Sequence, residues 1–219
     1  GQAGTGRRAQ RRLGAQAVAA GIGEPGRGLV VAPGVFEMVS AKIADRMGFE
    51  ALYMTGYGTV ASYLGLPDAG LATYTDMVNR VSQFTRITQT PFICDGDTGY
   101  GGLLNVMHTV RGYEAAGACA IQLEDQEFPK KCGHMLGRRV IPTQDMVEKI
   151  RVAVQTREDR NFQIIARTDA RTTLGLDEAL RRAESYARAG ADVLFVVPRL
   201  FGDVDTNHFR LLSASEIGG

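Results

Sequence analysis

Short apolar runs alternate along this chain with longer segments whose apolar residues recur at helical spacing. Val39, Ile43 and Met47 fall four residues apart, and this spacing predicts a helix over 37–47. The run from Leu29 to Ala32 is short and continuous, and a Pro-Gly pair ends it, so we expect a strand there. The regular part of the chain is therefore expected to open with a strand followed by a helix.

The same pair of elements is repeated along the rest of the chain. Further strands are predicted at 51–54, 92–94, 119–123, 163–166 and 193–197, and further helices at 75–88, 104–116, 143–156 and 177–189. The predicted strands are apolar on both faces, as strands are in a parallel sheet that helices cover. Repeated units of this kind indicate an α/β fold, either a closed (β/α)8 barrel or an open doubly wound sheet.

Polar residues follow the ends of four different predicted strands. They are Thr55-Gly56-Tyr57-Gly58, Asp95-Gly96-Asp97, Glu124-Asp125 and Arg167-Thr168-Asp169. A barrel gathers its chemistry on the loops after many strands, whereas an open sheet concentrates it at one switch point. The spread therefore favours a TIM-type barrel, and we expect residues 1–219 to form a single domain with an N-terminal leading helix.

The carboxylates in this set have the composition of an oxygen-only metal site. Asp95 and Asp97 belong to one turn, and Asp68 and Glu124 can join them from neighbouring loops. Mg²⁺ and Mn²⁺ prefer such ligands and keep positions open for water and substrate oxygens. Each acid taken alone is more readily explained as a turn former or a helix cap. Their common placement is what predicts a Mg²⁺ site, with Mn²⁺ as a substitute.

A basic loop, Pro129 to Arg139, carries a second kind of chemistry. Cys132 is flanked there by Lys130, Lys131 and His134, and a cationic setting lowers the pKa of a thiol towards the range useful in catalysis. The alternative is a solvated basic loop with an incidental cysteine. The other two cysteines, Cys94 and Cys119, fall within apolar strands and are interpreted as core residues.

Composition limits the remaining classes of protein. The chain has 219 residues, a net charge of +1 and no apolar run near the roughly 18 residues of a membrane helix, so neither nucleic acid nor a membrane is the expected partner. Three cysteines without close spacing do not make a disulfide framework, which favours a cytoplasmic location. The arginines at 7, 8, 11 and 12 would also suit an organelle transit peptide. We expect a small-molecule substrate.

Five motifs in a fixed order resemble those of a known family. They are Leu-Gly-Leu-Pro-Asp (64–68), Asp-Gly-Asp-Thr-Gly-Tyr-Gly (95–101), Gln-Leu-Glu-Asp (122–125), Lys-Lys-Cys-Gly-His (130–134) and Ala-Arg-Thr-Asp-Ala (166–170). Over about residues 28 to 196 the chain resembles the isocitrate lyase and phosphoenolpyruvate mutase superfamily, and within it the methylisocitrate lyase and dimethylmalate lyase branch. The resemblance implies a Mg²⁺-dependent barrel enzyme that acts on small carboxylates and assembles as a homo-oligomer, a dimer of dimers.

The reaction that this resemblance implies is cleavage of a carbon–carbon bond in a 2-hydroxy di- or tricarboxylate of the methylisocitrate, dimethylmalate or isocitrate type. It yields a 2-oxoacid and a carboxylate or dicarboxylate. The resemblance makes Cys132 the general acid, Arg167 the clamp on a substrate carboxylate and His134 the residue that tunes the thiol. It assigns the metal to Asp95, Asp97, Asp68 and Glu124, and substrate binding to Tyr53, Thr55, Gly56, Tyr57, Lys131, Gly133 and Arg167.

Two features depart from the family pattern. The sixth predicted strand runs into Val197-Pro198-Arg199, where the family has a glutamate followed by Ala-Pro. Residues 198–219 are also too few for two more strand and helix units, since one βαβ unit takes roughly 30 residues. We therefore expect an incomplete barrel of about six strands, with residues missing near 197 and after 219. Oxaloacetate hydrolysis, phosphonate rearrangement and a non-catalytic protein are the alternatives, although the Cys-Gly-His loop argues against the mutase.

Overall fold

The computed structural model describes residues 30–133, 135, 137–197 and 212–213 of the chain. Their strands form one sheet in sequential order, in which six strands run parallel and a short seventh strand is antiparallel to the sixth. The strands are Gly34–Val35 (β1), Leu52–Met54 (β2), Phe92–Asp95 (β3), Ala120–Glu124 (β4), Gln163–Thr168 (β5), Val193–Val196 (β6) and Leu212–Ser213 (β7). β1 and β7 do not pair with each other, so the described sheet is open.

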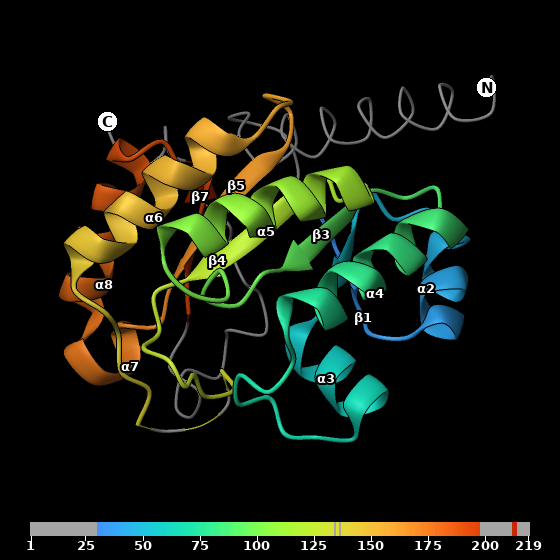
Figure 1. The fold of residues 1–219 in the computed structure, drawn as a ribbon, viewed down its shortest axis with the longest axis horizontal. Coiled ribbons are helices and arrows are strands. Elements are labelled where there is room, and N and C mark those ends of the chain that lie inside the picture. The colour runs from blue at the N-terminus through green and yellow to red at the C-terminus, as the bar shows by residue number, and fades with distance from the viewer. Residues whose placement is uncertain (1–29, 134, 136, 198–211, 214–219) are drawn as a thin grey trace.

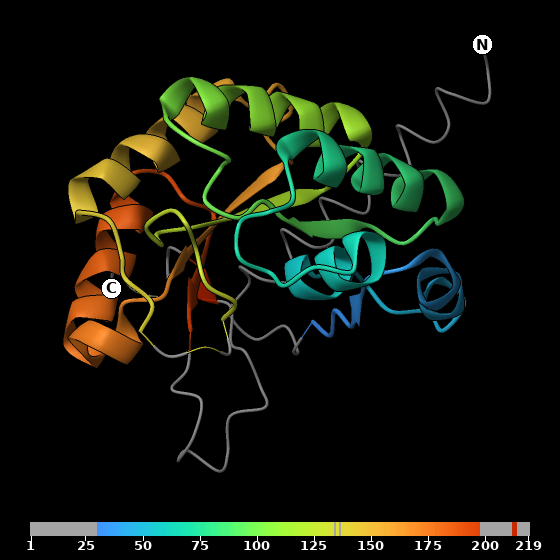
Figure 2. The same cartoon turned by 60° about the horizontal axis from the view of Figure 1, so that its bottom comes forward.

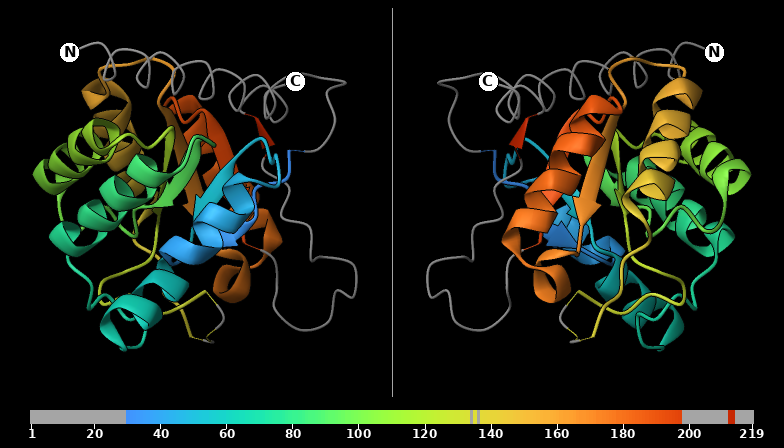
Figure 3. Two further views of the ribbon diagram at one scale, coloured as in Figure 1. Left: turned by 90° about the vertical axis from the view of Figure 1, so that its right-hand side faces the viewer. Right: turned by 90° about the vertical axis from the view of Figure 1, so that its left-hand side faces the viewer.

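The helices lie between these strands along the chain. They are Met38–Asp45 (α2), Gly56–Leu64 (α3), Tyr74–Ile87 (α4), Leu103–Ala116 (α5), Thr143–Thr156 (α6), Arg171–Leu174 (α7) and Leu176–Arg188 (α8). α4, α5 and α6 lie side by side over one face of the sheet (Figures 1 and 2), and α2 and α8 continue this layer at either end (Figure 3). The predicted α/β fold is confirmed, and the strictly sequential strand order is that of an opened barrel, because a doubly wound sheet reverses its order at a switch point.

Both faces of the sheet are buried, as the apolar strands predict. The larger core lies between the sheet and the helix layer and includes Met54, Phe92 and Ile121. A smaller apolar cluster covers the inner face: Ala51, Ile93, Cys119, Ala120, Ile165 and Val193. Burial raises the pKa of Cys119 to about 12 and also raises that of Cys94. Both cysteines are core residues, as interpreted from the sequence.

Two local predictions differ from the structure. The first strand lies at β1 instead of 29–32. Pairing with β2 sets its position, since the Tyr53 N–H donates to the Pro33 carbonyl at 3.0 Å and Gly34 pairs with Tyr53. Helices α3 and α7 were not predicted. α3 opens on Gly-Tyr-Gly, a poor helix sequence, and is held instead by burial of Thr59 and Val60. α7 is one turn with no buried residue.

Some expectations fall on residues outside the described ranges. The N-terminal leading helix precedes residue 30, and most of the segment after Val197 also lies outside, so these predictions stay untested. Among the described helices, none combines the length and the apolar character that crossing a membrane requires.

Candidate active site

Parallel pairing brings the carboxyl ends of β3, β4 and β5 to one edge of the sheet. Asp95 pairs with Gln122, and Glu124 pairs with Arg167, in the backbone register. Because side chains alternate between the two faces of a strand, Gln122 and Glu124 share a face, and their partners Asp95 and Arg167 lie on that face too. Three of the predicted site residues therefore project together from the inner face of the sheet.

Three neighbours hold Asp95 in place. The Gly56 N–H donates to Oδ2 at 3.2 Å, the Asp97 N–H donates to Oδ1 at 3.0 Å, and the Tyr113 hydroxyl donates to the Asp95 carbonyl at 3.1 Å. Gly56 is the first residue of α3, and a Cβ atom at this position would lie 2.4 Å from Asp95 Oδ2. The helix can therefore approach the carboxylate this closely only because residue 56 has no side chain.

The loop after β3 adopts an unusual backbone conformation that α5 and α6 support. Asp97 and Tyr100 have φ angles of 47° and 59°, in the left-handed region that residues other than glycine rarely adopt. The Tyr100 hydroxyl lies 2.9 Å from that of Tyr113, and Lys149 Nζ donates to the Thr98 carbonyl at 2.8 Å. Such strain persists only where surrounding contacts impose it, and it clusters at functional sites.

Lys130 stands between two of the acids that were predicted to bind a metal. Its Nζ lies 2.5 Å from Asp68 Oδ1 and 2.5 Å from Asp97 Oδ1, and its side chain is 4% exposed. Burial, opposed by Lys130 and reinforced by Asp95, raises the pKa of Asp97 to about 6. Asp68 and Asp97 are thus joined through an ammonium group.

Glu124 is the most buried of the four predicted metal ligands, at 2% exposure. Burial raises its pKa, and the guanidinium of Arg167, with Nη1 3.3 Å from Oε2, opposes that shift. The Gln126 amide donates to Glu124 Oε1 at 2.9 Å and also bonds both backbone groups of Lys131. Glu124 is therefore held in position and tied to the loop that follows β4.

Arg167 is engaged by protein carboxylates. Its Nε and Nη2 donate to the two oxygens of Asp169 at 2.9 and 3.0 Å, while Nη1 faces Glu124. Gly133 lies against this guanidinium, since a Cβ atom there would come 2.9 Å from Nη2. The guanidinium therefore has a defined orientation where the loop after β4 meets β5.

Of the predicted substrate-binding residues in and after β2, some lie beside these acids and others lie at the border of the site. Tyr53 packs against the apolar cluster of the inner face, and burial, followed by the negative charge of Asp95, raises its pKa. Thr55 is the N-cap of α3 but makes no capping bond through its side chain. Tyr57 is 55% exposed. Tyr53 and Gly56 thus join the site, whereas Thr55 and Tyr57 border it.

The loop that carries Cys132 is less exposed than its sequence indicates. Cys132 and Lys130 are buried, with 8% and 4% exposure, which argues against a simple solvated loop. Lys130 pairs with the acids, and Lys131 donates from Nζ to the Gly137 carbonyl at 3.1 Å, so both ammonium groups contact oxygen atoms of the protein. His134 lies outside the described residues.

The charges at this edge of the sheet fit a divalent cation. Five carboxylates face three cationic groups there: Asp68, Asp95, Asp97, Glu124, Asp169, Lys130, Arg138 and Arg167. The remaining excess of two negative charges matches Mg²⁺, which needs one or two carboxylates and keeps several waters. Among the described residues, no three His, Cys, Asp or Glu side chains converge to hold a metal ion. Asp95 takes part in none of the described ion pairs, so it is the carboxylate best placed to bind a cation.

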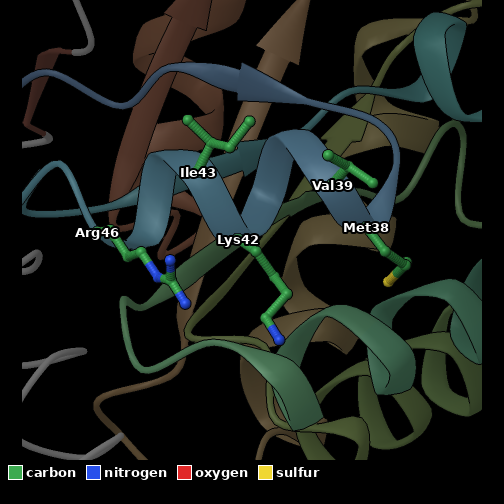
Figure 4. A pocket seen from close by; sticks show the side chains of 5 residues that line it. All are labelled: Met38, Val39, Lys42, Ile43 and Arg46. Atoms are coloured by element: carbon green, nitrogen blue, oxygen red, sulfur yellow. The ribbon is translucent and has the colours of Figure 1, made fainter.

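A hollow of about 300 Å³ lies away from this cluster, on the outer surface of α2. Met38, Val39, Lys42, Ile43 and Arg46 line it, along one side of the helix (Figure 4). It contains no acid, thiol or histidine and belongs to the helix layer. We therefore place the candidate active site at the strand ends, where the titratable groups meet.

Three residues of the site were not predicted from the sequence. Lys130 was assigned to the thiol, yet it bridges two carboxylates. Asp169 lies at a predicted strand end, a signal that could have identified it as the partner of Arg167. Arg138 carried no such signal, because its neighbour Arg139 looks equivalent in sequence although its side chain is 80% exposed.

The chain was compared with known protein families and curated proteins. Residues 23–209 match the family described as phosphoenolpyruvate phosphomutase. The 2,3-dimethylmalate lyase of Eubacterium barkeri is 55% identical over 168 residues, which is 77% of this chain and 58% of that protein. The 2-methylisocitrate lyase of Aeropyrum pernix is 50% identical over 169 residues, which is 77% of this chain and 54% of that protein. The chain thus spans somewhat more than half the length of these relatives.

Solved structures give the same relationship. A complex of oxaloacetate acetylhydrolase with 3,3-difluorooxalacetate superposes with a TM-score of 0.80 at 39% identity, covering 84% of this chain and 63% of the other. A 2,3-dimethylmalate lyase described as a member of the PEP mutase/isocitrate lyase superfamily gives 0.79 at 35% identity, covering 94% and 74%. A phosphonopyruvate hydrolase complex with oxalate and Mg²⁺ gives 0.77 at 35% identity, covering 85% and 63%.

Proposed function

Because the chain belongs to the phosphoenolpyruvate mutase and isocitrate lyase superfamily, we propose that it is a Mg²⁺-dependent carbon–carbon lyase. Its substrates would be 2-hydroxy di- or tricarboxylates of the methylisocitrate, dimethylmalate or isocitrate type. The products would be a 2-oxoacid and a carboxylate or dicarboxylate. Relatives named 2,3-dimethylmalate lyase and 2-methylisocitrate lyase support this class of reaction.

The observation that carries the proposal is the meeting of acids, a guanidinium and the thiol loop at one edge of the sheet. Asp95 and Glu124 end neighbouring strands, and Arg167 pairs with Glu124. Gly133, next to Cys132, lies against the Arg167 guanidinium. A substrate carboxylate on Arg167 would therefore have the acids on one side and the thiol loop on another, which is the arrangement that a hydroxycarboxylate lyase needs.

We propose that Asp95 binds Mg²⁺ directly, and that Asp68, Asp97 and Glu124 act around it directly or through water. Bound Mg²⁺ would stabilise negative charge that develops on the substrate oxygens during bond cleavage. The phosphonopyruvate hydrolase complex with oxalate and Mg²⁺ supports this choice of ion, and Mn²⁺ should substitute because it takes the same ligands.

The protein supplies the proton transfer and the binding of the substrate. In the cleavage, a carboxylate of the site would take the proton of the substrate hydroxyl, the neighbouring carbon–carbon bond would break, and its electron pair would remain on the carbon next to a substrate carboxylate. Cys132 would give its thiol proton to that carbon, as a general acid. Arg167 would hold a substrate carboxylate through Nη1, the nitrogen that faces Glu124, because Asp169 accepts from its Nε and Nη2. The 8% exposure of Cys132 supports a site that excludes water from the carbanion.

Oxaloacetate hydrolysis is the second candidate. It is favoured by the TM-score of 0.80 with oxaloacetate acetylhydrolase, whose inhibitor complex contains an oxaloacetate analogue. That substrate is also a small dicarboxylate with a polar group at carbon 2, so the same acids and arginine could bind it.

One assay separates these reactions. Release of a 2-oxoacid or of oxalate would be measured with isocitrate, methylisocitrate, dimethylmalate and oxaloacetate, with Mg²⁺ and with excess chelator. The lyase proposal expects Mg²⁺-dependent release of a 2-oxoacid from at least one hydroxycarboxylate. Oxalate from oxaloacetate alone would favour the second candidate, and turnover of none of the four would contradict both.

We also propose that the protein acts as a homo-oligomer, a dimer of dimers. One edge of β1 is unpaired in the described sheet, and exposed sheet edges are usually covered by other protein. Light scattering coupled to size-exclusion chromatography tests this, and a monomer at micromolar concentration would contradict it.

A further inference from the structure

We propose that Arg138 is a positioning residue that joins the Cys132 loop to Arg167. The catalytic part of this inference rests on the lyase function proposed above, whereas its structural part does not. Arg138 lies in the same loop as Cys132, six residues further along the chain, and its side chain is completely buried.

The Arg138 guanidinium connects two segments of the chain, its own loop and the segment that follows β5. Its Nη1 donates to the Gly133 carbonyl at 2.6 Å and to Asp169 Oδ1 at 2.7 Å. Its Nη2 donates to Thr172 Oγ1 at 3.0 Å, in α7. One side chain thus fastens the residue next to the thiol to the chain that follows β5.

Asp169 extends this connection to the substrate-binding arginine. Its Oδ1 accepts from both Arg138 and Arg167, and its Oδ2 accepts from Arg167 Nε at 2.9 Å. The Asp169 N–H donates to Asp125 Oδ1 at 2.9 Å, and Asp125 is itself held by Tyr186 at 2.8 Å. Because Arg138 and Arg167 donate to the same oxygen of this anchored carboxylate, Arg138 holds the loop against the group that also orients Arg167.

The contacts require an arginine. Two nitrogens of one planar group reach three acceptors, and a lysine has a single nitrogen that cannot span them. The next residue provides a matched control. Arg139 pairs with Glu127 at 2.8 Å, but its side chain is 80% exposed, so its loss should change little.

The first experiment needs no catalytic activity. Alkylation of Cys132 by iodoacetamide is followed by mass spectrometry in the wild type, Arg138→Lys and Arg139→Ala. The lysine variant keeps the charge, so its effect on the rate reports release of the loop. We expect roughly ten- to hundredfold faster alkylation, the change in an opening equilibrium that one charge-assisted hydrogen bond controls. Arg139→Ala should stay within twofold, and Cys94 and Cys119 should remain protected in every folded variant.

The second experiment measures how Arg138 acts through Arg167. In the wild-type background, Arg138→Lys should lower kcat and raise KM, so that kcat/KM falls by about tenfold or more. In an Arg167→Lys background the same change should still lower kcat, through the thiol loop, but should alter KM by less than twofold. A purely structural role would give equal effects in both backgrounds.

The outcomes distinguish the two proposals. Unchanged alkylation of Cys132 in folded Arg138→Lys would overturn the positioning role. Faster alkylation with no turnover by the wild type would leave that role standing and contradict the lyase function. If Arg138→Lys does not fold, Thr172→Val removes one of the same contacts more gently, and it should accelerate alkylation several-fold; no acceleration there would also overturn the inference.

Discussion

Replacing Gly56 by alanine tests how tightly the structure positions Asp95. Residue 56 is the first residue of α3, and its N–H donates to Asp95 Oδ2 at 3.2 Å. The added Cβ atom would lie 2.4 Å from Oδ2 and 3.1 Å from Cγ of Asp95. The helix start and the carboxylate must therefore move apart.

The size of the effect follows from these distances. Ordinary contacts of a Cβ atom begin near 3.4 Å, so the 2.4 Å approach demands a displacement of about 1 Å. A misplacement of about 1 Å in an active site can reduce the rate about a hundredfold, and the hydrogen bond from the backbone is weakened as well. Replacing glycine by alanine also reduces the conformational entropy of the unfolded chain, which stabilises the fold by roughly 0.4–1 kcal/mol and offsets part of the strain. We expect kcat/KM to fall about a hundredfold while the melting temperature changes by only a few degrees.

The assay is Mg²⁺-dependent release of the 2-oxoacid, with thermal unfolding measured on the same samples. Gly102→Ala is the matched control, because Gly102 precedes α5 near the same site, has a φ of −80°, and would place its Cβ atom in open space. Activity of Gly56→Ala within threefold of the control would show that the contact between α3 and Asp95 does not position the carboxylate.

Three further predictions address the metal, the thiol and the stability of the fold. Asp95→Asn should abolish Mg²⁺-dependent turnover with little change in the circular dichroism spectrum, since the acid best placed for the ion is lost. Full activity of this variant, or activity of the wild type in excess chelator, would contradict the metal site. Cys132→Ser should reduce kcat by about 10² to 10⁴ with little change in KM, because serine is a far weaker acid, and wild-type turnover would remove the thiol from the mechanism. Thr73→Ala should lower the free energy of unfolding by about 1 kcal/mol, because Thr73 and Asp76 form the capping box of α4. The Thr73 hydrogen bonds hold the pKa of Asp76 below its ordinary value of 3.8, so the stabilisation from the capping box should be present near neutral pH and lost as the pH falls below that value. Chemical denaturation at pH 7 and pH 3 measures this stabilisation, and an equal loss of stability in Thr73→Ala at both pH values would contradict its dependence on the Asp76 charge.

The repeating pattern was enough to predict most of the architecture. Five of the strands and five of the helices lie at or within a few residues of their predicted positions, because a sheet buried on both faces demands continuous apolar strands and a covering helix demands apolar residues at helical spacing. α3 was not predicted, because its first residues include two glycines and its stability comes from burial of Val60 against the core. The sequence around α3 does not indicate this contact between distant parts of the chain.

The sequence also predicted which reactive groups meet at the site. Asp95, Glu124 and Arg167 could be placed at one edge because parallel strands carry their carboxyl ends to the same side. Their partners could not be assigned in this way. Lys130 precedes the thiol by two residues, yet it lies 2.5 Å from carboxylates that are 33 and 62 residues away in sequence, at Asp97 and Asp68.

By itself, the sequence determined most of the strands and helices and which reactive groups follow each strand, because periodicity and residue chemistry are local properties. The tertiary structure alone decided how charge is shared among those groups. Arg138 and Arg139 are adjacent and chemically identical, but one is completely buried between Gly133 and Asp169 and the other is 80% exposed. Burial and ion pairing depend on segments that meet only when the sheet forms, and they therefore distinguish two arginines that the sequence leaves equivalent.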